Sequence, residues 1–136
     1  MKPYYKNSLG KIVELEQQKI LYLYSMNIVE LIIPDGCKEV NCWFNQLKEL
    51  IIPDGCEKVW CHNNRLKELI IPDGCKEVIC SYNQLKELII HDGCVKVWCW
   101  DNQLTELIIP DGCEIVSADL KSITELNIVE ELNLYI

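Results

Sequence analysis

The sequence contains almost no alanine and no long hydrophobic run. Ala118 is the only alanine among 136 residues, whereas isoleucine, valine, leucine, tyrosine and tryptophan abound. Because β-branched and aromatic residues favour strands, this balance predicts a mainly β fold. No apolar stretch approaches the ~18 residues that a membrane-spanning helix needs, so we expect no membrane segment.

Basic residues are outnumbered by acidic ones. The chain has 13 Lys and Arg against 21 Asp and Glu, which gives a net charge of -8. Binding to phosphate groups needs a basic stripe, and none is present, so we expect neither nucleic acid nor an anionic membrane as a partner. The N-terminal stretch MKPYYKNSLGK lacks the apolar region of a secretory signal, which favours a cytoplasmic protein.

A repeat of 19 residues dominates the chain. Cysteine directly after glycine recurs with this spacing at Cys37, Cys56, Cys75, Cys94 and Cys113. A second cysteine series has the same spacing, at Cys42, Cys61, Cys80 and Cys99. The unit is CxxVxCxxNxLxxLxIPDG, and a unit of this size must stack on its neighbours to bury its apolar residues.

Each unit is predicted to contribute a strand and a tight turn. In EVNC, KVWC and EVIC apolar residues alternate with variable ones, so Val40 and Cys42 point one way and Glu39 and Trp43 the other. Pro-Asp-Gly then turns the chain, because proline fixes φ and glycine permits a positive φ. We therefore predict parallel strands stacked ~4.8 Å apart over a core of Cys, Val, Leu and Ile.

The pattern resembles the leucine-rich repeat LxxLxLxxNxLxxLP, with cysteine at two of the leucine positions. The short unit is similar to repeats of bacterial effector proteins and of arrays encoded by giant viruses that infect amoebae. This resemblance covers roughly residues 18–132. It implies a leucine-rich-repeat solenoid, mainly β, with a right-handed coil, a parallel sheet on the concave face and extended or turn segments on the convex face. For a viral protein the expected location would be the host cytoplasm or the virion.

An inward ladder of asparagines is also implied by the resemblance, at Asn45, Asn64, Asn83 and Asn102. Their amides would bond to main-chain groups where each coil bends away from the sheet. We predict an N-terminal cap over residues 1–17, for which a hairpin is one candidate, and about six coils over residues 18–131. Residues 132–136 are predicted as a C-terminal cap or edge strand.

One face of the predicted sheet carries all four tryptophans of the chain. The predicted binding residues on it are Tyr22, Tyr24, Trp43, Trp60, His62, Ile79, Trp98 and Trp100. Exposed aromatic clusters are costly unless covered, and Trp and Tyr are favoured anchors at interfaces. This face therefore predicts a non-enzymatic protein–protein interaction module with a protein partner. The alternative is that the rings only pack across strands and stabilise the sheet.

The opposite side carries a second apolar stripe. If the LxI stretch is extended, its outward residues are Ile32, Ile51, Ile70, Ile89 and Ile108. A structural homo-oligomer, for instance a homodimer, assembled through this stripe or through open coil ends is therefore the alternative function. Burial of these isoleucines between neighbouring coils is an equally weighted alternative.

Neither catalysis nor metal binding is expected. His62 follows Cys61, but alternation along a strand places the two side chains on opposite faces, so they cannot form a dyad. The cysteine spacing is CxxxxC rather than the CxxC typical of zinc sites, so we predict thiols packed in the core and no cofactor. Stacked coils would bring cysteines close enough for disulfides, which a reducing compartment would prevent.

Overall fold

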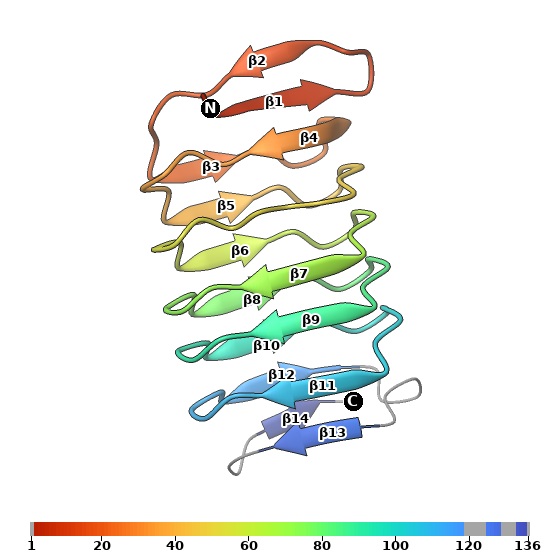
Figure 1. Ribbon diagram of the computed structural model, residues 1–136. Coiled ribbons are helices and arrows are strands. Elements are labelled where there is room, and N and C mark those ends of the chain that lie inside the picture. Colours follow the sequence, from red (N-terminus) through yellow and green to blue (C-terminus); the bar gives the residue numbers. More distant parts are fainter. Residues whose placement is uncertain (1, 119–124, 129–132, 136) are drawn as a thin grey trace.

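The computed structural model describes residues 2–118, 125–128 and 133–135. These residues form fourteen short strands and no helix. Figure 1 shows the strands wound into a stack of similar coils, with the N-terminus at one end. The predicted mainly β solenoid is therefore confirmed. With no helix in the described part of the chain, none is long and apolar enough to cross a membrane.

The main sheet has seven parallel strands, one from each successive coil. They are β3 (Ile20–Tyr22), β5 (Glu39–Asn41), β6 (Lys58–Trp60), β8 (Glu77–Ile79), β10 (Lys96–Trp98), β12 (Ile115–Ser117) and β14 (Asn133–Tyr135). Equivalent residues of neighbouring repeats pair directly, as Val40 does with Val59 and Val59 with Val78. The repeat predicts this register, because a shift by one residue would turn the valines toward solvent.

The second side of the coils, opposite the main sheet, has less continuous strand pairing. It carries β4 (Ile28–Ile32), β7 (Glu68–Ile71), β9 (Glu87–Ile90), β11 (Glu106–Ile109) and β13 (Glu125–Ile128). The strands β7 and β9 pair in parallel, and so do β11 and β13. No strand forms at residues 49–52, so the second side is interrupted between β4 and β7.

A hairpin at the N-terminus lies against the first coil. Strand β1 (Tyr4–Asn7) pairs antiparallel with β2 (Ile12–Glu14) and, on its other edge, with β4. The hairpin therefore extends the second side of the stack and ends it at β2 (Figure 1). Tyr5 and Leu15 pack against the buried core from this hairpin and from the chain that follows it.

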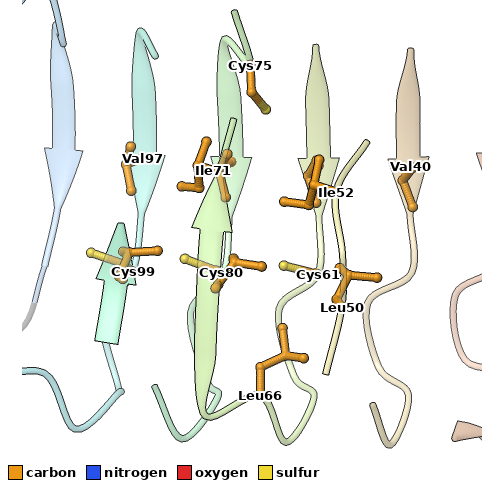
Figure 2. Close-up of a cluster of buried hydrophobic side chains, with 14 of the residues drawn as sticks. Val40, Leu50, Ile52, Cys61, Leu66, Ile71, Cys75, Cys80, Val97 and Cys99 are labelled. Atoms are coloured by element: carbon orange, nitrogen blue, oxygen red, sulfur yellow. The ribbon is translucent and has the colours of Figure 1, made fainter. Parts of the chain in front are cut away.

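The core lies between the two sides and consists of columns of like residues. All nine cysteines are buried and none forms a disulfide. Figure 2 shows Cys61, Cys80 and Cys99 in one row across neighbouring coils, with Ile71 and Val97 in the same interior. Cysteine acts there as a small apolar residue that fits between stacked coils.

The asparagine ladder is confirmed by its hydrogen bonds. The Leu47 N–H donates to Asn64 Oδ1 at 2.9 Å, and Asn64 Nδ2 donates to the carbonyls of Cys42 and Cys61 at 3.0 and 3.1 Å. Leu47 and Cys42 belong to the preceding coil, whereas Cys61 belongs to the same coil as Asn64. Asn45, Asn83 and Asn102 make equivalent bonds. Each asparagine thus joins two coils at the point where the chain leaves the sheet.

The chain leaves the sheet through one residue in the left-handed conformation. These residues are Ser25, Phe44, Asn63, Tyr82 and Asp101, with φ between 53° and 58°. This conformation costs roughly 1–2 kcal/mol for a bulky residue such as Phe44. The Phe44 N–H donates to the carbonyl of His62 in the next coil at 3.0 Å, so hydrogen bonding between coils offsets the strain.

Candidate functional site

We define the aromatic face as the solvent side of the main sheet from β3 to β10, together with the residue that follows each strand by two positions. It holds all eight predicted binding residues, namely Tyr22, Tyr24, Trp43, Trp60, His62, Ile79, Trp98 and Trp100. Tyr22, Tyr24 and Trp100 are exposed, and the other five are half-buried. Every tryptophan of the chain therefore lies outside the core.

Three rings form a continuous stack along this face. The Trp43 ring lies between Tyr24, at 4.7 Å and 4° between planes, and the imidazole of His62, at 5.3 Å and 9°. These centroid separations match the spacing of about 4.8 Å between stacked strands, so residues in register reach stacking distance without distortion. The Phe44 ring adds an edge contact to Trp43 at 5.8 Å. The stack stabilises the sheet and at the same time presents a flat apolar surface.

Burial of His62 in this stack changes its titration. Desolvation lowers the pKa of His62 from the ordinary value of 6.5, because removing water disfavours the charged imidazolium. The ring is therefore neutral at physiological pH, with one nitrogen able to donate and the other to accept. A neutral ring stacks on Trp43 without a charge that needs solvation.

The stack is interrupted in the next coil. The column of Tyr24, Trp43 and His62 continues with Ser81, whose side chain is too small to stack, and resumes with Trp100. A cavity of about 250 Å³ opens at this gap. We call it the Ser81 slot; its lining consists of His62, Asn63, Ile79, Ser81, Tyr82, Trp98 and Trp100.

Unpaired polar atoms gather on the same face. Among the described residues, the buried side-chain atoms without a hydrogen-bond partner are Asn41 Oδ1, Trp60 Nε1, His62 Nδ1 and Ser81 Oγ. An unpaired buried polar group costs about 1–3 kcal/mol. The protein itself therefore leaves some of the hydrogen-bonding capacity of this face unused. Asn41 and Ser81 lie on the outward side of the sheet, yet they are only 4% and 5% exposed.

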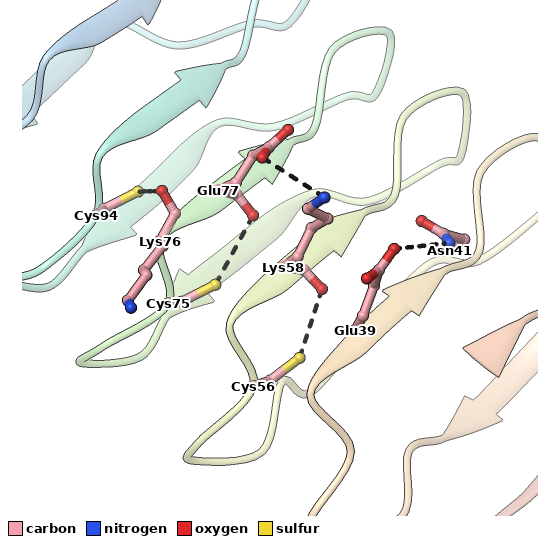
Figure 3. A network of polar contacts seen from close by, with 8 residues as sticks. All are labelled: Glu39, Asn41, Cys56, Lys58, Cys75, Lys76, Glu77 and Cys94. Atoms are coloured by element: carbon pink, nitrogen blue, oxygen red, sulfur yellow. Dashed lines mark hydrogen bonds and ion pairs between the residues drawn. The ribbon is translucent and has the colours of Figure 1, made fainter. Parts of the chain in front are cut away.

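The charged residues of the face form one ion pair rather than a continuous series. The alternation of Glu39, Lys58, Glu77 and Lys96 predicts opposite-charge pairs between all neighbouring coils. Of these four residues, all of which the structure describes, only Lys58 and Glu77 form an ion pair, at 3.9 Å (Figure 3). Lys58 Nζ also lies 5.3 Å from the ring centroid of Trp60. Glu39 instead accepts a hydrogen bond from Asn41 Nδ2 at 3.4 Å.

The thiols lie on the inner side, away from this face. Figure 3 shows Cys56 and Cys75 directed at the carbonyls of Lys58 and Glu77, at 3.6 and 4.0 Å. Desolvation raises the pKa of Cys42 to about 12, which keeps the thiol protonated. A protonated, buried thiol is a poor nucleophile and a poor metal ligand.

Two further arrangements bear on chemistry. Cys61 is fully buried while His62 lies on the aromatic face, so the two side chains are on opposite sides as predicted. Among the residues that the structure describes, no group of three or more His, Cys, Asp or Glu is arranged to hold a metal ion.

The isoleucine stripe is exposed on the second side. Ile51 is 84% exposed, and Ile70, Ile89 and Ile108 are exposed as well, whereas Ile32 is half-buried. The interpretation that these residues point outward is therefore right, and burial between coils is wrong for four of the five. A groove of about 490 Å³ runs beside the stripe, where residues 49–52 form no strand; acidic side chains such as Glu49 and Glu68 border it.

Comparison with protein-family models and with curated proteins finds no match to this chain. The aromatic face and the isoleucine stripe are therefore the features of the molecule that point to a function.

Proposed function

We propose that this protein is a non-enzymatic, leucine-rich-repeat-type interaction module that binds a protein partner through its aromatic face. The observation that carries the proposal is that the face holds more aromatic side chains than the fold requires. Asn41 and Ser81 occupy the same columns as Trp60 and Trp100 with equivalent backbone structure. The rings are therefore free to serve a purpose other than forming the coil.

The polar groups of the face support a partner that buries it. Trp60 Nε1 and Ser81 Oγ have no hydrogen-bond partner among the described residues, and groups from a partner would satisfy them. Large aromatic side chains that bear a polar group are the preferred anchors of protein interfaces. A net charge of -8 disfavours polyanions as the partner. Nine free thiols fit a reducing compartment, so we propose a cytoplasmic location.

The test compares capture of partners by three forms of the protein. We expect the double variant Trp60→Ser and Trp98→Ser to lose the partner that the wild-type protein retains in a pull-down. The matched control, Ile70→Ser and Ile108→Ser, removes two exposed apolar side chains from the second side and should retain that partner. Circular dichroism of each variant checks that the fold persists. Retained capture by the tryptophan variant would contradict the proposal.

A second function is favoured by the isoleucine stripe. A monomer rarely exposes a long row of apolar side chains, and Ile51 at 84% exposure stands beside the groove of about 490 Å³. A homodimer formed through this stripe would bury it. Light scattering gives the molar mass: a stable dimer that the Ile70→Ser and Ile108→Ser variant dissociates would favour this structural role over capture of a different protein.

A further inference from the structure

The Ser81 slot lies between the stack of Tyr24, Trp43 and His62 and the ring of Trp100, which makes a tilted contact with Tyr82 at 6.3 Å and 34°. His62 and Trp100 are separated by two coils, which corresponds to about 9.6 Å at the usual spacing of stacked strands. A flat ring placed midway would lie about 4.8 Å from each neighbour. Tyr24, Trp43 and His62 already stack at 4.7 and 5.3 Å, so the added ring would continue the same series.

The slot also offers hydrogen bonds to the edge of such a ring. Ser81 Oγ is buried, in a residue that is only 5% exposed, and it has no hydrogen-bond partner among the described residues. His62 Nδ1 likewise has no hydrogen-bond partner among the described residues, and both His62 and Ser81 line the cavity. A hydroxyl both donates and accepts, and a neutral imidazole nitrogen without hydrogen accepts. A ring that carries an N–H or O–H group would satisfy at least one of these atoms.

We infer that the Ser81 slot is an anchor pocket for one planar aromatic side chain with an N–H or O–H group, a Trp or Tyr of the partner protein. This inference rests on the proposed function, since it names the residue type through which the partner binds the aromatic face. The ring enters between His62 and Trp100 and lies against Ile79 and Trp98. Its polar group bonds to Ser81 or His62.

The size and surroundings of the slot favour a side chain over a free small molecule. Pockets for small molecules usually measure about 300–1,000 Å³ and enclose most of their ligand. This slot measures about 250 Å³ and opens onto a face with further aromatic residues. A partner that presents one ring here places its neighbouring surface on Trp60 and Trp98. A nucleotide base would bring phosphates toward an acidic protein, which is unfavourable.

One substitution fills the slot without disturbing the fold. The column already holds Trp43 and Trp100, so Ser81→Trp places a ring that the coil accommodates and completes the stack. We expect the thermal stability of this variant to equal or exceed that of the wild type. The matched control is Lys67→Trp, which adds the same ring at an exposed position outside the aromatic face.

The first experiment is a titration followed by NMR chemical shifts, with N-acetyl-tryptophanamide as the probe and N-acetyl-leucinamide as the non-planar comparison. We expect saturable shifts at Ile79, Ser81 and the Trp98 indole with the aromatic probe only. Ser81→Trp should weaken the probe's affinity by about tenfold or more, and Lys67→Trp should leave it unchanged. Shifts spread evenly to Tyr22 and Tyr24, or an affinity unchanged in Ser81→Trp, would overturn the inference.

The second experiment separates this inference from the proposed function. In the pull-down, Ser81→Trp should lose the same partner that Trp60→Ser with Trp98→Ser loses, while Lys67→Trp keeps it. If the tryptophan variant loses the partner but Ser81→Trp keeps it, the proposed function stands and the anchor pocket is wrong. If the probe binds the slot and no variant alters capture, the ring does not come from a partner protein, and the inference is likewise wrong.

Discussion

Removal of one ladder asparagine, Asn64→Ala, should destabilise the whole array far more than an ordinary surface substitution. The Leu47 N–H would lose its acceptor and remain buried, at a cost of about 1–3 kcal/mol. The carbonyls of Cys42 and Cys61 would each lose one of two donors, because Asn45 and Asn83 continue to bond to them. Each such loss costs about 0.5–1.5 kcal/mol, which gives about 2–6 kcal/mol altogether.

That loss is large beside the total stability of about 5–15 kcal/mol that is typical of a domain. Urea unfolding followed by circular dichroism and by tryptophan fluorescence measures the change in the free energy of unfolding. Two probes are needed because repeat arrays can unfold coil by coil. Gln84→Ala is the control, since its side chain is exposed beside Asn83; we expect a change within about 0.5 kcal/mol.

A second variant separates the donor and acceptor roles of the amide. Asn64→Asp retains an acceptor for the Leu47 N–H but sets a carboxylate against the carbonyls of Cys42 and Cys61. We expect it to be less stable than Asn64→Ala at about pH 7 and to recover at about pH 4, as the buried carboxyl binds a proton. If the free energy of unfolding of either Asn64 variant at about pH 7 lies within about 0.5 kcal/mol of the wild-type value, the ladder does not hold the coils together.

Three further outcomes are expected. Cys61→Ser should destabilise the protein by about 1–3 kcal/mol more than Cys56→Ser in urea unfolding. The Cys56 Sγ already has a carbonyl acceptor at 3.6 Å, whereas a hydroxyl at the fully buried position of Cys61 would lack an acceptor. Burial raises the pKa of Cys42 and Cys56 from 9.0 to about 12. The stability that these thiols contribute is therefore present below pH 9 and is lost as pH rises toward 12. A Cys42→Ala variant should show a shallower decline of the urea midpoint with rising pH. Burial lowers the pKa of His62, so the stability that the neutral imidazole contributes is lost as pH falls below 6.5. Trp43→Ala should admit water to the imidazole and so raise this pKa, as measured by an NMR titration.

Much of the fold could be predicted because the repeat specifies both the spacing of the strands along the chain and the direction in which each side chain points. Val40 and Cys42 alternate with Glu39 and Trp43, and this alternation alone determines which residues enter the core. The position of Asn64 between a strand and the next apolar stretch indicates a residue that bonds to the main chain. These features follow from hydrophobicity and hydrogen-bonding needs that are the same in every coil.

The details of the aromatic face could not be predicted in the same way. Columns give the order of the rings but not their orientation, so the parallel stack of Trp43 on His62 was not foreseen. The signal for the Ser81 slot is present in the column, since a small residue lies between two rings, but its depth depends on how Tyr82 and Trp98 orient. Burial of Asn41 on the outward face was also missed, because neighbouring side chains cover it.

The asparagine ladder repeats by simple translation along the stack. Asn64 bonds to Leu47 and Cys42 as Asn83 bonds to Leu66 and Cys61, so inserting or deleting one complete unit would recreate the same contacts. An insertion of any other length inside a coil would misalign them. The protein can thus lengthen or shorten in whole modules, while the residues on its aromatic face diversify independently of the scaffold that carries them.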